Sequence, residues 1–309
     1  MRLDSKNTAV VFAYHSVGVR CIKTLLARGV QIALVVTHED NPNETIWFES
    51  VVELCKEQGI PTVTPADPAL PELMQQITEI APDFIFSFYY RHMLPISLLA
   101  LAKNGAYNLH GSLLPKYRGR VPVNWAVLHG ESETGATLHE MAAKPDAGGI
   151  IAQTAVPILP DDTAHEVFGK LTVAAEQTLW YALPALLNGT AKARNNDLSQ
   201  GSYFGGRTPE DGRINWALPA QQVYNLHRAV APPYPGAFNE VAGNTYVIAK
   251  ARLAPASNTV APNLPQGLSV VDNVILGVCG DGRALHIIEL LLNGKMISAQ
   301  ALQCQLVTQ

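Results

Sequence analysis

Two compact apolar runs near the start of the chain have the pattern of strands buried on both faces of a parallel sheet. They are TAVVFAY at Thr8–Tyr14 and QIALVVT at Gln31–Thr37, and neither shows the regular polar alternation of a half-exposed strand. Between them, Val17–Arg28 carries apolar residues at helical spacing and is followed by Gly29, a common helix stop. The start of the chain therefore predicts a strand–helix–strand unit.

The same alternation continues through the N-terminal part of the chain. Further helices are predicted over Ile46–Gln58, Leu70–Ile80, Pro95–Lys103 and His165–Leu187, and further strands over Asp83–Tyr89 and Gly105–His110. Strands and helices in alternation with short joints are typical of an α/β domain with a doubly wound, mostly parallel, Rossmann-like sheet. We expect this catalytic domain to span residues 1–203.

The pattern changes in the C-terminal part. Asn195–Arg213 is polar and rich in glycine, which predicts a linker. A short helix over Ala220–Ala229 follows, and then β-like runs separated by Pro and Gly: Thr245–Leu253, Leu268–Val278 and Ala284–Leu291. This pattern predicts a smaller, open β-barrel domain over residues 204–309.

Composition excludes several classes of protein. The four cysteines are far apart and form no C-x-x-C pair, which argues against a zinc site or a disulfide framework and favours a reducing, cytoplasmic environment. No apolar run approaches the roughly 20 residues that cross a bilayer, so we expect no membrane insertion. The formal net charge of −4 argues against a nucleic-acid partner. The first predicted strand is followed by a single glycine, Gly18, where a dinucleotide-binding turn needs three, so we expect no NAD.

The stretch NLHGSLLPKYRG carries the first candidate chemistry. Asn108 and His110 are two residues apart on a predicted strand and therefore point to the same face, at the carboxyl end where open α/β sheets build their sites. An amide donor beside an imidazole suits acyl transfer to an amine, because His can remove the proton of the amine while Asn stabilises the oxyanion. From spacing alone, a turn-capping Asn and a buried structural His explain the pair equally well.

The second candidate lies in GATLHEMAAKPDAGGII, at Gly135–Ile151. A β-like run leads into a short loop with Asp146, followed by Gly148 and Gly149. If Asp146 meets His110, it would select the imidazole tautomer and favour its charged form. Taken alone, an aspartate that only organises a turn fits the pattern as well.

Together these motifs resemble the folate-dependent formyltransferases. NLHGSLLPKYRGRVPVNWA, followed by TGATLHEM and DAGGII, is similar to the motifs of a family that includes methionyl-tRNA, glycinamide ribonucleotide and sugar-nucleotide enzymes. The resemblance implies that Asn108, His110 and Asp146 are the catalytic trio. It also implies that 10-formyltetrahydrofolate is the co-substrate and that no metal takes part.

The resemblance further implies a set of folate contacts in three short segments. These residues are His92, Met93, Leu94, Leu113, Leu114, Pro115, Arg120, Ala142, Ala143, Lys144 and Pro145. Backbone groups would bind the pterin edge, and the leucines and proline would wall the site. Ordinary core packing remains an alternative for the apolar members.

Five further motifs resemble one branch of the family, the enzymes that formylate UDP-4-amino-4-deoxy-L-arabinose in lipid A (lipopolysaccharide) biosynthesis and polymyxin resistance. They are VVFAYHSVG, THEDNP, SFYYRHMLP, RTPEDGRINW and RAVAPPYPGAF. In the bifunctional members of this branch, an NAD-dependent decarboxylase domain follows. We therefore expect such a partner, either separate or fused, and a UDP-amino sugar as the acceptor.

Alternatives remain open at this stage. They are a methionyl-tRNA formyltransferase, an enzyme for another UDP- or dTDP-amino sugar, a formyl-folate hydrolase and a catalytically silent folate-binding domain. The short acidic loop at 38–44 and the scattered cations after residue 217 argue against tRNA, whose binding needs many Lys and Arg. A sugar diphosphate needs one or two cations, for which Lys116, Arg118 and Arg207 are candidates, and the Tyr89–Tyr90 pair is a candidate for packing on a sugar or base.

Because no His/Cys cluster with metal-ligand spacing occurs in the sequence, formyl transfer is expected to persist after exhaustive chelation and dialysis. The measurement is the rate of product formation before and after treatment. A clear loss of rate that added zinc restores would contradict this prediction.

Overall fold

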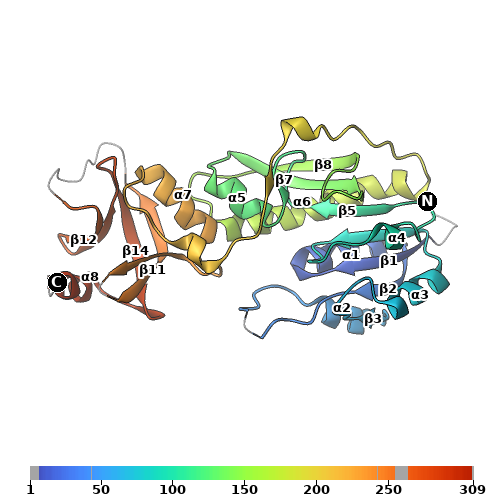
Figure 1. Cartoon of the computed structure of the whole chain (residues 1–309), viewed down its shortest axis with the longest axis horizontal. Coiled ribbons are helices and arrows are strands. Elements are labelled where there is room, and N and C mark those ends of the chain that lie inside the picture. The colour runs from blue at the N-terminus through green and yellow to red at the C-terminus, as the bar shows by residue number, and fades with distance from the viewer. Residues whose placement is uncertain (1–6, 43, 242, 255–263, 308–309) are drawn as a thin grey trace. The chain divides into compact units, whose positions relative to one another are not determined.

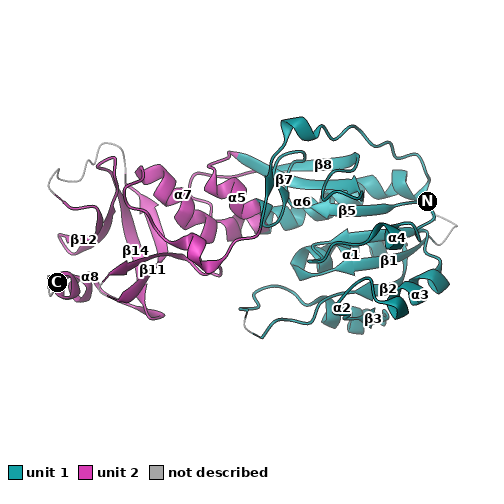
Figure 2. Ribbon diagram, viewed as in Figure 1, with its two compact units in different colours: residues 1–122, 133–156, 169–205 teal, residues 123–132, 157–168, 206–309 magenta. Residues whose placement is uncertain are grey.

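A computed structural model describes residues 7–42, 44–241, 243–254 and 264–307, with the last side chain described at residue 306 (Figure 1). The chain forms two compact units (Figure 2). The first contains 1–122, 133–156 and 169–205, and the second contains 123–132, 157–168 and 206–309. Two segments of the predicted first domain, 123–132 and 157–168, thus belong to the second unit, so no single cut separates the units. Our assignment of 1–203 and 204–309 as domains stays a prediction.

The first unit is built on a seven-stranded sheet in the order β3-β2-β1-β4-β5-β7-β8. Its strands are β1 (Thr8–Ala13), β2 (Gln31–Val36), β3 (Thr62–Val63), β4 (Phe84–Phe88), β5 (Ala106–His110), β7 (Glu133–Glu140) and β8 (Ile150–Pro157). All pairs from β3 to β5 are parallel, and β7 is antiparallel to β5. The predicted doubly wound, mostly parallel sheet is confirmed.

Helices alternate with these strands. They are α1 (His15–Ala27), α2 (Val51–Gln58), α3 (Pro71–Ile80), α4 (Ile96–Leu99), α5 (Pro122–Leu128) and α6 (Ala164–Leu187). Apolar residues of α3 and α4 pack with alternate residues of β1 and β2 and with Ile85 of β4 in one buried cluster, because side chains two apart on a strand share a face. The helices α1 and α6 lie side by side, since Arg20 pairs with Glu176 and the Arg28 guanidinium lies 3.5 Å from the centre of the Trp180 ring.

Some element boundaries differ from the prediction. The helix expected over Ile46–Gln58 begins only at Val51, because the Ser50 side chain accepts a hydrogen bond from Glu53 N and caps the helix there. The helix expected over Pro95–Lys103 is shorter, Ile96–Leu99.

The polar segment predicted as a linker contains regular structure. It includes the 3₁₀ turns η1 (Leu198–Gln200) and η2 (Pro209–Gly212), and the strand β9 (Tyr203–Phe204). This strand pairs in parallel with β6 (Arg118–Gly119) in a separate two-stranded sheet. The chain does pass from the first unit to the second within this segment, between residues 205 and 206, as a linker would. The segment is nevertheless ordered by contacts with a distant part of the chain.

The second unit contains an antiparallel sheet in the order β10-β11-β14-β13-β12, with β15 beside β14. Its elements are α7 (Ala220–Val230), β10 (Ala237–Val241), β11 (Asn244–Leu253), β12 (Gly267–Val271), β13 (Val274–Val278), β14 (Ala284–Leu292), β15 (Lys295–Met296) and α8 (Ala299–Val307). The run predicted as one strand over 268–278 is a hairpin. Asp272 and Asn273 both have positive φ at its tip, as in a tight hairpin turn.

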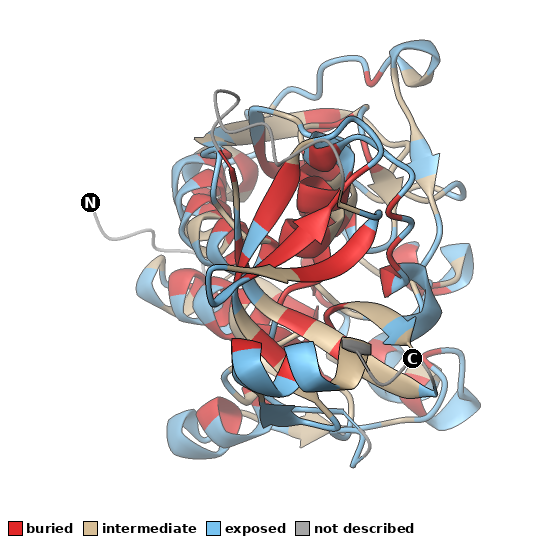
Figure 3. Cartoon of the chain, turned by 90° about the vertical axis from the view of Figure 1, so that its left-hand side faces the viewer, coloured by how far each residue is buried: buried red, intermediate tan, exposed pale blue. Residues whose placement is uncertain are grey.

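The sheet of the second unit curls as an open half-barrel, as the sequence predicted (Figure 1). Buried residues gather on its strands, while exposed residues occupy loops and outer helix faces (Figure 3). Trp216 fills part of this core: a Cβ atom at Gly277 would lie 2.4 Å from its ring, so only glycine fits there. Among the helices of the described residues, none has the length and hydropathy needed to cross a membrane.

A buried histidine makes the stability of the second unit depend on pH. His227 on α7 is 2% exposed, and its Nε2 accepts a hydrogen bond from Ala251 N at 3.2 Å. Burial lowers the pKa of His227 from 6.5 to about 4. Between these values the unfolded chain binds more protons than the folded one, so stability is full above about pH 6.5 and falls as the pH drops towards 4, by about 3 kcal/mol at most.

The test is urea unfolding between pH 7 and pH 4.5 of the wild type and of His227→Gln, which keeps an acceptor. We expect the variant to lose part of the acid-induced drop in the free energy of unfolding. His286→Gln, at an exposed histidine on β14, should keep the drop. Equal pH dependence in the wild type and His227→Gln would contradict the assignment.

Candidate active site

The carboxyl end of β5 presents Asn108 and His110 on one face. His110 is buried and Asn108 is partly buried. The parallel neighbour β4 and the antiparallel neighbour β7 fix β5 between them, with Asn108 opposite His139 and His110 opposite Thr137. The two residues therefore sit on a backbone that is hydrogen-bonded on both sides, which limits their movement.

The contacts of His110 assign its two ring nitrogens. Nε2 lies 2.7 Å from the Tyr117 carbonyl oxygen, and because a carbonyl can only accept, Nε2 donates. Nδ1 lies 3.4 Å from Oδ1 of Asp146. Nδ1 is therefore the nitrogen that can gain or lose a proton during a reaction.

Asp146 reaches this position because the loop after β7 folds back over the face that carries Asn108 and His110. The residue has a φ of +51°, and its Oδ2 accepts a hydrogen bond from Gly119 N at 2.8 Å. Burial by itself raises the pKa of Asp146, but two neighbouring imidazoles and the Gly119 amide outweigh it and hold the pKa well below its usual range. The carboxylate is thus ionised throughout the neutral range.

A second histidine completes the site, and sequence reasoning missed its role. His139 on β7 is buried, and its Nδ1 donates to the Glu140 carbonyl at 2.7 Å. In the neutral ring, Nε2 is then the acceptor for Asn108 Nδ2 at 3.1 Å, and it lies 3.5 Å from Asp146 Oδ1. One amide hydrogen of Asn108 is engaged, and the other is left for a substrate oxygen. The signal available in the sequence was the alternation in TLH, which places Thr137 and His139 on the same face of a strand.

The loop after β5 is held by two side chains that the sequence did not single out. Thr137 Oγ1 donates to the Ser112 carbonyl at 2.6 Å and accepts from Leu114 N at 3.1 Å. Gln153 on β8 donates to the Leu114 carbonyl at 2.9 Å. These bonds determine the path of the chain directly after His110.

The folate residues implied by resemblance lie in three loops, after β4, β5 and β7. His92 and Met93 are exposed, whereas Leu94 is 8% exposed and belongs to the core cluster of the sheet. The side chain of Leu94 therefore packs inside, and only its backbone is available to a ligand.

The other implied folate residues also differ in how far their side chains are buried. Leu114 is buried, and Leu113 and Pro115 are half-buried. The exposed members are Arg120, Ala143 and Lys144, and the half-buried ones in the loop after β7 are Ala142 and Pro145. A folate role for all these residues stays a prediction. Within the described part of the chain, no group of three His, Cys, Asp or Glu side chains is placed to hold a metal ion.

Comparison with known proteins matches both parts of the chain to one family. The sequence model described as "Formyl transferase" matches residues 7–183, and that described as "Formyl transferase, C-terminal domain" matches residues 207–305.

Three solved structures with similar folds share 18–20% identity with this chain. WlaRD, described as a sugar 3N-formyl transferase, has 20% identity and a TM-score of 0.72 over 94% of this chain and 99% of its own. An N-formyltransferase from Helicobacter canadensis has 19% identity and a TM-score of 0.68 over 92% and 99%. HypX from Aquifex aeolicus has 18% identity and a TM-score of 0.63, over 93% of this chain but 44% of its own.

The geometry predicts that His110→Ala, Asn108→Ala and Asp146→Ala each lower kcat of formyl transfer at least about 10²-fold, since each removes an acid–base group, an oxyanion donor or the charge beside the imidazole. Steady-state kinetics measure the effect, and circular dichroism verifies the fold. His286→Gln is the control with unchanged kcat. Near-native kcat in any of the three alanine variants would refute the role given to that residue.

Proposed function

The chain belongs to the formyl transferase family, and we propose that it transfers a formyl group from 10-formyltetrahydrofolate to the amino group of a nucleotide-linked sugar. One observation carries the chemical part of this proposal. Asp146, which is distant in sequence, meets Asn108 and His110 at the end of β5, with 3.4 Å between the imidazole and the carboxylate. They combine an oxyanion donor, an acid–base group and a fixed negative charge in one site.

The arrangement suits attack of an amine on the formyl carbon. A bond forms between the acceptor nitrogen and this carbon, and the carbonyl oxygen gains negative charge. The free hydrogen of the Asn108 amide donates to that oxygen. His110 Nδ1 takes the proton that the amine loses, and a proton returns to N10 of the folate, from His110 or through a water, as the carbon–N10 bond breaks.

Asp146 supports the charged form of His110 during this cycle. Because the low pKa of Asp146 keeps it ionised, its charge faces Nδ1 at the moment when that nitrogen is protonated. The Tyr117 carbonyl holds the opposite nitrogen, so the ring cannot turn away easily. The roles of base and acid can then alternate on one atom.

The descriptions of similar structures support both substrates. WlaRD is described in the presence of dTDP and 5-N-formyl-THF, and the Helicobacter canadensis protein with folinic acid and dTDP-3-aminofucose. HypX is described in complex with tetrahydrofolic acid. These proteins share the fold of this chain, and the motifs quoted above favour UDP-4-amino-4-deoxy-L-arabinose as the sugar, with lipid A modification as the purpose.

The acidic loop at 38–44 argues for a small acceptor. Asp40 accepts a hydrogen bond from the Tyr14 hydroxyl at 2.7 Å, and Arg91 forms two bonds of 2.9 Å with Glu44. Arg91, the cation that pairs with this loop, is therefore already neutralised by Glu44. Asn43 lies outside the described residues. A loop of this kind does not attract a polyanion such as tRNA.

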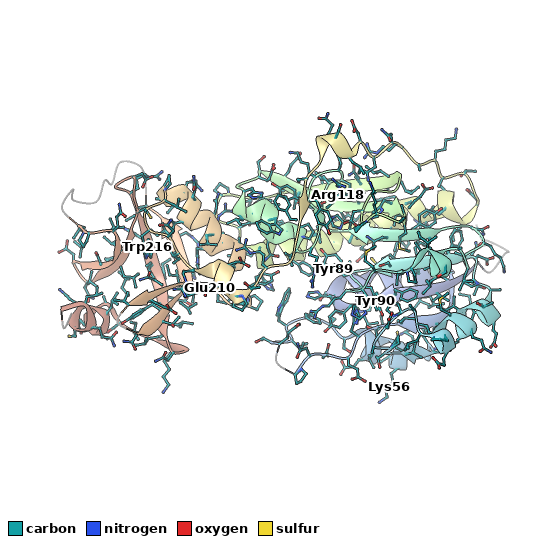
Figure 4. The ribbon with its side chains drawn as sticks, in the orientation of Figure 1. Lys56, Tyr89, Tyr90, Arg118, Glu210 and Trp216 are labelled. Atoms are coloured by element: carbon teal, nitrogen blue, oxygen red, sulfur yellow. The ribbon has the colours of Figure 1, made fainter. Side chains whose placement is uncertain are left out.

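Arg118 is the best candidate for the diphosphate. It is half-buried, its Nε has no hydrogen-bond partner, and it forms no ion pair within the residues that the structure describes. Figure 4 labels its position in the first unit. Its guanidinium can bind a phosphate through two parallel bonds. Lys116 is exposed, and Arg207 in the second unit already donates to the Asp211 carbonyl at 2.9 Å.

Of the two tyrosines, Tyr89 lies next to the candidate site and Tyr90 packs against the core of the sheet. Tyr89 has a φ of +58°, and a Cβ atom at Gly111 would lie 2.2 Å from its hydroxyl, so its ring reaches the residue after His110. Tyr90 instead stacks on His38 at 4.2 Å and packs on the core cluster. We assign a contact with the sugar to Tyr89.

The proposal includes a cytoplasmic location and a supplier of the amino sugar. Cys21, Cys55 and Cys279 are buried thiols, as in proteins of reducing compartments. The resemblance assigns the supply of substrate to an NAD-dependent decarboxylase, separate or fused.

The decisive measurement compares formylation of UDP-4-amino-4-deoxy-L-arabinose, a dTDP-amino sugar and initiator methionyl-tRNA, each with 10-formyltetrahydrofolate, at about 0.15 M salt. We expect the UDP sugar to react fastest. Arg118→Ala should raise its KM about 10-fold or more, because a charge-assisted contact is lost, whereas Lys56→Ala, at an exposed position on α2, should not.

Three outcomes would contradict parts of the proposal. Faster formylation of the tRNA would overturn the acceptor class, and a faster dTDP sugar would overturn only the nucleotide. Release of formate without any amine product would identify a hydrolase.

A further inference from the structure

The segment at 193–204, which follows α6 by a few residues, contacts both loops that carry the catalytic chemistry. We call this segment the strap. It starts with an antiparallel bridge in which Arg194 and Ile150 exchange two backbone hydrogen bonds of 2.9 Å. It ends with β9, which pairs with β6. Between these points it runs past the Asp146 loop and the loop after β5.

Asn196 holds the backbone of the Asp146 loop. This residue is 6% exposed, and its Nδ2 donates to the carbonyls of Asp146 at 2.9 Å and of Gly148 at 3.0 Å. An amide nitrogen has two hydrogens, so both bonds form at once. The first of these carbonyls belongs to Asp146, the residue with positive φ, so the two bonds stabilise the turn that directs its carboxylate towards His110.

The other end of the strap holds the partners of the catalytic side chains. Ser202 Oγ accepts from Tyr117 N at 2.9 Å, and Arg118 N donates to the Ser202 carbonyl at 3.0 Å. Tyr117 is the residue whose carbonyl binds His110 Nε2, and Gly119 is the residue whose amide binds Asp146 Oδ2. The strap therefore fixes the peptides on both sides of the His110–Asp146 pair.

Close backbone approaches leave the strap little freedom. A Cβ atom at Gly119 would lie 2.2 Å from the Phe204 carbonyl oxygen, and one at Gly201 would lie 2.2 Å from that of Pro115. The Tyr117 and Phe204 rings also stack, with centroids 5.4 Å apart. Such contacts transmit a displacement of the strap directly to the catalytic loops.

We propose that the strap is a positioning element for catalysis, in which Asn196 and Ser202 hold the Asp146 loop and the loop after β5 at the distance that pairs Asp146 with His110. This inference rests on the proposed function for its kinetic consequences. Neither residue contacts the reacting atoms, so each acts through Asp146 or through Tyr117. Misplacement of a catalytic group by about 1 Å costs up to about 10²-fold in rate.

The test uses the full chain with Asn196→Ala and, as matched control, Asn195→Ala at the adjacent exposed asparagine. We expect kcat to fall about 10- to 100-fold in Asn196→Ala, with both KM values within about 3-fold of wild type. In an Asp146→Asn background, Asn196→Ala should have little further effect, because its role depends on the carboxylate. Asn195→Ala should match the wild type.

Hydrogen exchange provides a readout that needs no substrate. Mass spectrometry should show faster exchange in the peptide covering 142–149 of Asn196→Ala, with β1 unchanged as internal reference. If the wild type formylates none of the amines, the proposed function fails, while the exchange data still decide whether the strap holds the loop.

Two results would overturn the proposal. The first is that Asn196→Ala has the same kcat and the same hydrogen exchange as Asn195→Ala. The second is that Asn196→Ala lowers kcat by the same factor in the wild type and in the Asp146→Asn background. If Asn196→Ala does not fold, Ser202→Ala and Ser202→Thr decide. We expect Ser202→Ala to lose kcat and Ser202→Thr, which keeps the hydroxyl, to restore it. Wild-type kcat in Ser202→Ala would then refute the strap's role.

Discussion

An ionised carboxylate in a nearly closed environment is the constraint on which this site depends. A buried charge is costly unless it is paired and hydrogen-bonded, and Asp146 meets this condition with the His110 imidazole, 3.4 Å away, and the Gly119 backbone amide. The loop can fold back far enough only because Gly148 has no side chain: a Cβ atom there would lie 2.0 Å from the Glu140 carbonyl oxygen. The chemistry at the end of β5 follows from this one placement.

The sheet supplies the rigid half of the site, and the loops supply the other half. Because β5 is parallel to β4 and antiparallel to β7, it is the strand at which the sheet changes direction. The register across the antiparallel pair brings His139 beside Asn108, so the amide that we propose as the oxyanion donor is oriented by a strand and not by a loop. Loops tolerate variation in sequence and length, which suits the parts that recognise different acceptors.

Formyl transfer from the folate and binding of the proposed acceptor need charges of opposite sign. The folate chemistry needs a fixed negative charge next to an imidazole, and that charge is buried, where screening is weak. The diphosphate of the proposed acceptor would need positive charge, which a half-buried Arg118 can offer. In the loop at 38–44, Glu44 is paired with Arg91 and Asp40 accepts a hydrogen bond from the Tyr14 hydroxyl, so the cation beside this loop is not available to attract a polyanion.

The sequence by itself determined the α/β class, the C-terminal antiparallel sheet and the pairing of Asn108 with His110, because these follow from periodicity and from motifs of local spacing. Helix ends were less certain, since one capping side chain such as Ser50 moves them. Tertiary structure alone decided the meeting of Asp146 with His110, the orientation of Asn108 by His139 and the ordering of the strap. Each of these depends on contacts between residues far apart in the chain, and no local pattern encodes such contacts. The polar, glycine-rich strap resembles a linker in sequence because its hydrogen bonds go to distant backbone groups rather than to its neighbours.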